Sequence, residues 1–159
     1  MRIFTGSYNN CKLGELVSIS GDKGKRVGFT GNAYTKLAPK KEFWQTWHNN
    51  IGKINEEENN KFYMKEYYKN VLLKLNSKEI IKELSDYGNN VILLCYEDKD
   101  DFCHRHLVAT WLEKKLQIKV PEIAIDKNAD IEVLSRNSKY VNEFNEIMKE
   151  IDLEEEVER

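Results

Sequence analysis

The hydrophobic pattern of the chain alternates between short apolar runs and longer amphipathic segments. Arg2–Thr5 and Val91–Cys95 are short apolar runs, and Leu16–Ser20 alternates in the manner of a β-strand. Lys119–Ile125 is a further strand candidate, with Pro121 near its start. These four runs predict short strands.

The amphipathic segments predict helices between and after these strands. Pro39 suits the first turn of a helix, and Asn76 with Glu79 three residues later is a variant of the capping box. The expected helices cover residues 39–51, 60–75, 76–84, a segment that Asp100 or Asp101 caps, and 139–151. The aromatic side chains of the first helix are interpreted as core and its histidine as a surface residue: Phe43, Trp44, Trp47 and His48.

Short strands separated by long helices predict an α/β fold, a three-layer sandwich with a short, mainly parallel sheet and flanking helices. At 159 residues the chain is long enough for one domain with a substantial core. We expect that domain to span residues 1–152 and the acidic tail 153–159 to fray. In such sheets ligands bind beyond the carboxyl ends of the strands. These ends are Gly6-Ser7-Tyr8, Ser20-Gly21-Asp22 and Tyr96-Glu97.

The composition of the chain indicates its expected cellular location and the kinds of partner it could bind. The chain has no window of about 18 apolar residues and no apolar signal segment at its N-terminus, so we expect a cytoplasmic location and no membrane partner. The three cysteines are then reduced thiols. The net charge is −2, but most charged residues in segment 1–53 are basic and most charged residues in segment 143–159 are acidic. This asymmetry fits a polyanionic partner at the basic end, and two solvated surfaces would explain it equally well.

The largest group of potentially reactive side chains in the sequence follows the Val91 strand. Glu97 comes directly after it, and Cys103, His104 and Arg105 then fall on the first turn of a helix. Helical periodicity points His104 into the buried stripe, places Cys103 and Arg105 at its edges, and turns His106 to solvent. Free N–H groups and the fork of the guanidinium favour anion binding there. The same positive field is expected to lower the pKa of the Cys103 thiol.

One interpretation of this turn is a site for a phosphate-bearing ligand, either a nucleotide or a nucleic acid, with Arg105 as its main cation. In an enzymatic version, Cys103 is nucleophile or acid, His104 is its proton partner, and Glu97 orients His104. The sequence leaves open whether the protein is an enzyme. Further expected ligand contacts come from the strand ends and the basic loop after the second strand: Gly6, Ser7, Tyr8, Ser20, Lys23, Lys25, Arg26 and Tyr96.

Two other interpretations remain open. In one, Cys103 responds to oxidation or alkylation, with Cys95 as the resolving thiol. In the other, the motif is structural and the protein is a non-catalytic interaction module. Two cysteines and two histidines also satisfy a zinc site by count. Adjacent side chains on one helix are expected to diverge, however, and the spacing matches no standard zinc site, so no metal and no cofactor are predicted.

Two neighbouring segments resemble the domain of unknown function 488 family. They are Leu-Cys-Tyr-Glu at residues 94–97 and Phe-Cys-His-Arg-His-Leu-Val-Ala at residues 102–109. Thr-Gly-Ser-Tyr at residues 5–8 and Lys-Leu-Ala-Pro at residues 36–39 are also similar to that family, and the resemblance covers about residues 1–125. It implies an α/β three-layer fold and a site at Glu97, Cys103, His104 and Arg105. It implies no established reaction.

Overall fold

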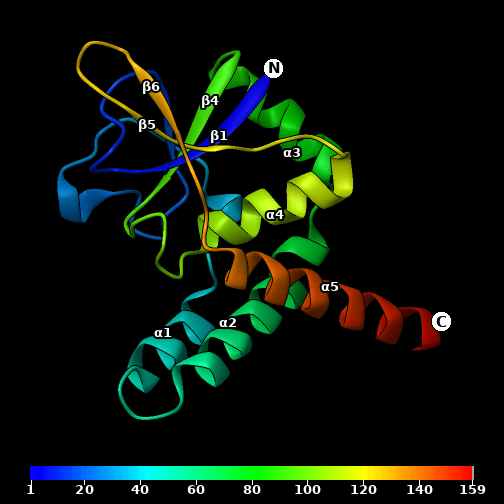
Figure 1. Ribbon diagram of the computed structural model, residues 1–159. Coiled ribbons are helices and arrows are strands. Elements are labelled where there is room, and N and C mark those ends of the chain that lie inside the picture. The colour runs from blue at the N-terminus through cyan, green and yellow to red at the C-terminus, as the bar shows by residue number, and fades with distance from the viewer. Residues whose placement is uncertain (159) are drawn as a thin grey trace.

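The computed structural model describes residues 1–158, and its centre is a sheet with the strand order β3-β2-β4-β1-β5-β6 (Figure 1). Neighbouring strands are parallel except for the pair β5 and β6, which is antiparallel. The expected α/β sandwich with a mainly parallel sheet is therefore confirmed. The strands are β1 Arg2–Ser7, β2 Glu15–Ser18, β3 Asn32–Ala33, β4 Asn90–Cys95, β5 Glu122–Ile125 and β6 Ile131–Leu134.

The α-helices lie in the order that the amphipathic pattern predicts, with shifted ends. Asn76 caps α3 as expected, because its side chain accepts hydrogen bonds from the backbone N–H groups of Lys78 and Glu79. Short 3₁₀ turns cover residues 25–27, 35–37, 72–74 and 85–87. The helices are α1 Lys41–Asn50, α2 Glu56–Asn70, α3 Ser77–Leu84, α4 His104–Leu116 and α5 Ser138–Glu158.

Helix α2 spans Glu56–Asn70 instead of the predicted 60–75, and α5 extends beyond the predicted 139–151. α2 begins earlier because Asn55 caps it, accepting from the N–H of Glu58, and three glutamates in its first turn complement the helix dipole. The acidic tail, for which fraying is predicted, continues α5 as helix over residues 153–158. Glutamate is a good helix former, and the buried residues Phe144 and Ile151 anchor the preceding turns.

The direction of the crossovers explains why the helices gather on one face of the sheet. The connections β3–β4 and β4–β5 each pass one strand in the same direction, so right-handed crossovers carry α1–α3 and α4 to the same face. The β1–β2 connection runs the other way, and its loop lies on the opposite face. Figure 1 shows α4 between the sheet and the pair formed by α2 and α5. The sheet, α4 and this pair are the three layers.

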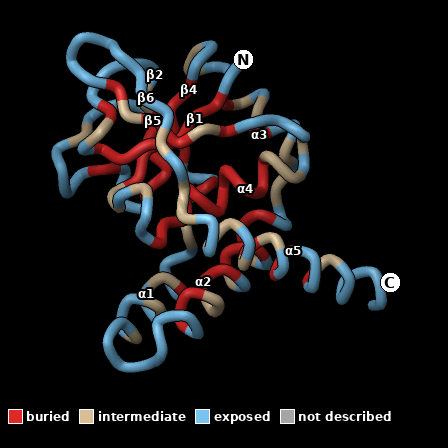
Figure 2. The backbone as a smooth tube through the Cα atoms, viewed as in Figure 1, coloured by how far each residue is buried: buried red, intermediate tan, exposed pale blue. Residues whose placement is uncertain are grey.

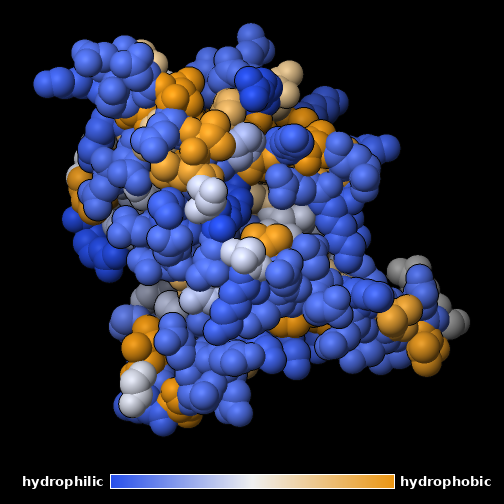
Figure 3. Space-filling model, viewed as in Figure 1, coloured by the Kyte–Doolittle hydropathy of each residue, from blue (hydrophilic) through white to orange (hydrophobic). Residues whose placement is uncertain are grey.

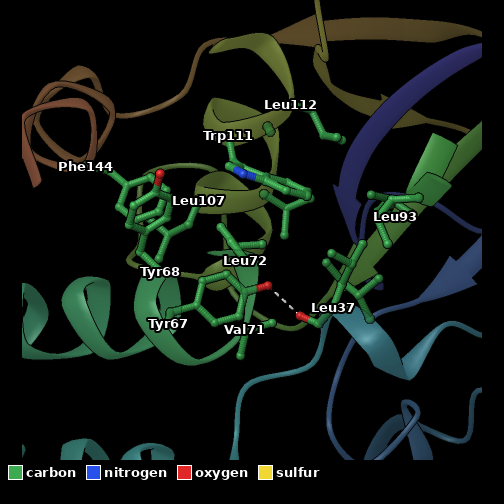
Figure 4. Close-up of a cluster of buried hydrophobic side chains, with 14 of the residues drawn as sticks. Leu37, Tyr67, Tyr68, Val71, Leu72, Leu93, Leu107, Trp111, Leu112 and Phe144 are labelled. Atoms are coloured by element: carbon green, nitrogen blue, oxygen red, sulfur yellow. Dashed lines mark hydrogen bonds between the residues drawn. The ribbon is translucent and has the colours of Figure 1, made fainter. Parts of the chain in front are cut away.

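The main core fills the space between these layers, where Figure 2 shows most of the buried backbone. In Figure 4, Tyr68 of α2 and Phe144 of α5 lie together, and their rings meet edge to face with centroids 6.0 Å apart. The hydroxyl group of Tyr67 donates a hydrogen bond to the carbonyl oxygen of Leu37, which joins α2 to the segment that precedes α1. A second, smaller apolar cluster on the other face of the sheet contains Phe4 and Ile92, among others.

The surface is mostly polar on the face that Figure 3 shows, with apolar patches near β6 and at the C-terminal end of α5. Exposed Ile131 and Val133 lie on β6, and exposed Leu153 and Val157 lie on α5. Within residues 1–158, no helix has both the length and the apolar character that crossing a bilayer requires.

Candidate functional site

A cavity of about 670 Å³ lies at the carboxyl end of the sheet, where β2 and β4 end opposite α1. Its inner end is formed by the buried residues Cys95, Cys103 and His104, which we call the Cys–His cluster. Glu97 lies beside this cluster and also lines the cavity. The parallel pairing of β4 with β1 and β2 places the three strand ends at one edge, as the sequence predicts.

Cys103, and neither Asp100 nor Asp101, is the N-cap residue of α4. Its backbone is extended, with φ −155° and ψ 141°, and the helix begins at His104. Because the change from extended to helical backbone falls between these two residues, their side chains converge. The expected divergence of Cys103 and His104 is therefore wrong, since it assumed that both residues lie within the helix.

The Cys–His cluster is compact. The Sγ atoms of Cys95 and Cys103 and a ring nitrogen of His104 all lie within 4.8 Å of one another. The Nδ1 atom of His104 is 3.6 Å from Cys95 Sγ, and its Nε2 atom is 2.8 Å from the carbonyl oxygen of Ile19. A carbonyl oxygen only accepts, so Nε2 carries a proton, and in the neutral form of the imidazole Nδ1 then carries the lone pair. Ile19, and not Glu97 as expected, orients the imidazole.

The thiol and the carboxyl group in this region have raised pKa values. Burial raises the pKa of Cys103 to about 12, Cys95 adds to the effect, and the nearby Arg105 opposes it without outweighing it. The direction is opposite to the predicted lowering of the thiol pKa, because burial disfavours the thiolate more than the guanidinium favours it. Burial, followed by the charge of Cys103, raises the pKa of Glu97 to about 7. A carboxyl group in this range suits proton transfer near neutral pH.

Arg105 lies away from the cavity. Its side chain is fully buried and forms a bidentate ion pair with Glu122 of β5, at 3.1 Å from Nε and 2.8 Å from Nη2. One residue beyond His104, the helix has turned toward β5 and β1. The expected contact between Arg105 and a ligand therefore has no support in the cavity, although Nη1 of Arg105 lies 3.4 Å from Cys103 Sγ.

Glu122 joins Arg105 to further buried polar groups that sequence reasoning missed. Thr5 donates to the Glu122 carboxylate at 2.6 Å, and Arg136 approaches it at 3.4 Å. His106, predicted at the surface, is buried, and its Nδ1 atom lies 3.0 Å from Nη1 of Arg136. Burial and then Arg105 lower the pKa of His106 to about 3, so this ring is neutral. Two guanidinium groups thus face one carboxylate.

The predicted ligand contacts divide into two groups. Ser20, Arg26 and Tyr96 line the cavity, together with Cys103, His104 and Glu97. Lys23 and Lys25 are exposed on the same loop as Arg26 but outside the lining. The guanidinium carbon of Arg26 lies 4.2 Å from the centre of the Tyr96 ring, a cation–π contact that holds a positive charge at the edge of the cavity.

The end of β1 supports the cavity from behind. Gly6 packs so closely against Cys11 that an added Cβ atom would lie 2.5 Å from its Sγ, and Ser7 accepts a hydrogen bond from the backbone of Asn10. The Tyr8 hydroxyl is 2.8 Å from the hydroxyl of Ser20, and its ring packs 4.9 Å from the ring of Tyr96. Gly6, Ser7 and Tyr8 are therefore outside the cavity lining, in contrast to the expectation.

Helix α1 supplies the opposite wall, which sequence reasoning assigned to the core and the surface. Trp44, Trp47 and His48 line the cavity, as do Lys41 and Ile51. The rings of Trp44 and His48 are stacked, with centroids 4.8 Å apart and an interplanar angle of 9°. The spacing of residues 44, 47, 48 and 51 places them on one helix face. This shared face was the feature of the sequence that could have indicated the cavity wall.

Comparison with known proteins gives a family and no characterised relative. Residues 20–116 match DUF488-N3a, the active DUF488-N3 subclade. This segment begins just after β2 and contains strands β3 and β4, the cavity wall of α1 and the whole Cys–His cluster. No curated protein and no solved structure matches the chain.

Proposed function

The chain belongs to the DUF488 family, in a subclade described as active, and on that premise we propose that its cavity binds a nucleotide whose reactive part meets the Cys–His cluster. The observation that carries this proposal is the joining of three features in one cavity: an aromatic wall, two cationic side chains at the rim and a buried thiol–imidazole end. A volume of about 670 Å³ falls in the range typical of small-molecule sites.

The aromatic wall supports the base of the nucleotide. Trp44 and Trp47 of α1 face the cavity, and Tyr96 closes it from the sheet side. Planar heteroaromatic rings stack on such side chains regardless of base identity. The indole N–H of Trp47 is already held by the side chain of Asn60 at 3.0 Å, so this ring is fixed before a ligand arrives.

Arg26 and Lys41 support the phosphate. Both side chains lie at the cavity, and both residues are exposed, so their charges can reach a ligand in solution. They replace Arg105, whose charge is already matched by Glu122. Asp22 also lines the cavity, but its carboxylate accepts from the N–H groups of Gly24 and Arg26. Within the described residues the Arg26 guanidinium contacts the Tyr96 ring and has no ion pair or hydrogen bond of its own, so it is available for a bidentate contact with phosphate.

The inner end of the cavity supports chemistry on the bound nucleotide. Cys103 and Cys95 offer sulfur atoms, and Glu97 offers a carboxyl group 3.7 Å from Cys95 Sγ. Cys95 and Cys103 are buried, and Glu97 is half-buried beside them. We propose thiol or acid–base chemistry at this point, with His104 held in one orientation by Ile19.

Equilibrium binding tests the proposal. Nucleoside monophosphates and triphosphates are titrated into the full chain while tryptophan fluorescence is recorded, because Trp44 and Trp47 line the cavity. Short single-stranded oligonucleotides form a second arm, which distinguishes a free nucleotide from one carried in nucleic acid. We expect saturable quenching by nucleotides and much weaker quenching by the matching nucleosides.

Arg26→Ala and Lys25→Ala form a matched pair for this titration. The two cations lie one position apart on the same exposed loop, and Arg26 alone of the two lines the cavity. We expect Arg26→Ala to weaken nucleotide binding about tenfold or more, in line with a charge-assisted contact, and Lys25→Ala to bind like the wild type. Equal affinity in all three proteins, or no saturable binding by any nucleotide, would refute the proposal.

Thiol redox sensing is the second candidate, because the sulfur atoms of Cys95 and Cys103 lie within 4.8 Å of each other. A peroxide would oxidise one thiol to a sulfenic acid, and attack by the other thiol would form the disulfide and release water. Peptide mapping after peroxide treatment tests this candidate. A Cys95–Cys103 disulfide that forms faster than any modification of Cys11 would support it, and its absence would remove it.

A further inference from the structure

We propose that Cys95, Cys103 and His104 form a binding site for a divalent transition metal ion, for which zinc is the best fit. Two sulfur donors and one imidazole nitrogen are the donor set that zinc favours over the oxygen-seeking ions. The three donors come from two elements, the end of β4 and the first turn of α4, so the fold brings them together.

The distances agree with a tetrahedral ion. Zinc lies about 2.3 Å from sulfur and about 2.0–2.1 Å from nitrogen, so a tetrahedral angle separates a sulfur and a nitrogen ligand by about 3.5 Å. The observed separation of Cys95 Sγ and His104 Nδ1 is 3.6 Å. Two sulfur ligands would lie about 3.8 Å apart, and all three donors here lie within 4.8 Å of one another. Contraction by about 1 Å or less would complete the geometry.

The imidazole is oriented as in established metal sites. Metal-bound histidine donates its second ring N–H to a carbonyl or carboxylate, which fixes the tautomer and aims the lone pair at the ion. Here Nε2 of His104 is 2.8 Å from the carbonyl oxygen of Ile19, and Nδ1 points at the sulfur of Cys95. The tautomer that this hydrogen bond requires is the tautomer that a metal ion requires.

The surroundings also suit two thiolates. Nη1 of Arg105 lies 3.4 Å from Cys103 Sγ, and the hydroxyl of Ser20 lies 3.7 Å from Cys95 Sγ. Arg105 and Arg136 together face only the one carboxylate of Glu122 within the described residues, so this region has a positive charge to spare beside Cys103. A divalent ion bound by two thiolates forms a complex with no net charge. Its sulfur atoms still carry partial negative charge, so Arg105 can donate a hydrogen bond to the sulfur of Cys103.

The fourth position of such an ion would face the cavity beside Glu97. Three protein donors with an open position are typical of catalytic zinc sites, whereas structural sites fill all four positions. An ion there would polarise a water molecule or a ligand atom at the inner end of the cavity. The inference deepens the proposed function by assigning a cofactor to the same site, but metal binding itself does not require a nucleotide.

Cobalt(II) is the probe for this site. The full chain is treated with a chelator under reducing conditions, dialysed and titrated with Co²⁺ while the absorption spectrum is recorded. We expect one cobalt ion per chain, with the intense charge-transfer absorption of thiolate ligands and the visible bands of a tetrahedral ion. Zinc added in equal amount should displace the cobalt and remove the colour, since zinc has the higher affinity for such donors.

Cysteine variants identify the ligands. Cys103→Ser and Cys95→Ser should each reduce the charge-transfer absorption strongly, whereas Cys11→Ser should leave it unchanged. Cys11 is the matched control because it is also a buried free thiol, but its sulfur contacts the carbonyl oxygen of Ile123, outside the cluster. Near-ultraviolet circular dichroism shows whether each variant folds, and the spectrum of the wild type tests the inference even if a variant does not.

Substoichiometric cobalt, or a weak octahedral spectrum without charge-transfer absorption in the wild type, would overturn the inference. Loss of the signal in Cys11→Ser but not in Cys103→Ser would also overturn it. Nucleotide titrations of the chelator-treated and the zinc-loaded protein keep the two hypotheses apart. Nucleotide binding without metal binding refutes the metal site alone, and metal binding without nucleotide binding refutes the proposed function alone.

Discussion

Arg105 and Glu122 form a bidentate ion pair whose side chains are both fully buried between α4 and β5. The pair lies directly behind the Cys–His cluster, since the guanidinium also contacts Cys103. Burial costs both ions their hydration, and only good geometry with further hydrogen bonds compensates. Thr5 and Arg136 provide those bonds to Glu122. The most conspicuous cation of the sequence motif is therefore part of the framework that holds the cluster.

Arg105→Ala should destabilise the protein by about 3–5 kcal/mol, because it leaves the Glu122 carboxylate buried and without its main partner. Urea denaturation measures the change. Lys36→Ala is the control, since Lys36 also pairs with a glutamate, Glu83, but in an exposed position where such pairs contribute little. Under conditions in which Arg105→Ala is folded, its nucleotide affinity should equal that of the wild type. A stable variant without nucleotide affinity would instead mean that Arg105 reaches the ligand.

The contribution of Glu122 to stability should depend on pH in the acid range. Burial raises the pKa of Glu122, but hydrogen bonds and the charge of Arg105 outweigh that effect and hold the pKa below its ordinary value of 4.5. A lowered pKa in the folded state means that ionised Glu122 stabilises the fold above about pH 4.5 and that this stabilisation is lost as the pH falls further.

The comparison of wild type with Glu122→Gln isolates this effect, because other acid-titrating groups are shared by the two proteins. Their free energies of unfolding, measured from pH 7 to pH 3, should differ most near neutral pH and converge as the pH falls below 4.5. A difference that stays constant across this range would show that the charge of Glu122 does not contribute.

Trp44→Ala should weaken nucleotide binding by about 1–3 kcal/mol, the usual value of one base–aromatic stack, or roughly 5–150-fold in affinity. The ring lies at the cavity, stacked on His48, and is only partly buried, so its removal should cost little stability. Trp44→Phe retains an aromatic face and should recover most of the affinity. Fluorescence is altered in these variants, so isothermal titration calorimetry is the appropriate measurement. Unchanged affinity in Trp44→Ala would exclude stacking on this wall.

The place of the cavity in the fold could be predicted from the sequence because it depends on local patterns. The apolar runs fix β1, β2 and β4, and parallel pairing then places Tyr96 and the Cys103 turn at one edge of the sheet. Strand periodicity also carries information about Cys95, which shares the α4-facing side of β4 with Val91 and Leu93. The proximity of Cys95 to the turn follows from that alternation.

The arrangement of the polar groups at the candidate site could not be predicted because it depends on a single backbone change and on distant residues. An extended Cys103 converges with His104, whereas a helical Cys103 would diverge from it, and the local sequence does not distinguish the two. The orientation of Arg105 is decided by Glu122, seventeen positions later on β5. The aromatic wall depends on how α1 packs across the sheet edge, which helical periodicity alone leaves undetermined.

The loop that presents Arg26 depends on Gly24, and this dependence gives a final prediction. Gly24 has φ 80°, and an added Cβ atom would lie 2.7 Å from Cβ of Phe29 and 2.9 Å from the hydroxyl of Tyr8. Gly28, in the same loop, has φ 73° and open space around the corresponding position. Both alanine variants incur the cost of a left-handed backbone, about 1–2 kcal/mol. Gly24→Ala must in addition displace Tyr8 or Phe29.

We therefore expect Gly24→Ala to be less stable than Gly28→Ala and to bind nucleotide more weakly, because Tyr8 packs against Tyr96 and Tyr96 holds the Arg26 guanidinium. Urea denaturation gives the order of stability, and calorimetric titration gives the affinity. Equal losses of stability would show that backbone strain alone sets the cost at both positions. Normal affinity in a destabilised Gly24→Ala would separate Arg26 from the packing behind it and weaken its assignment as a phosphate contact.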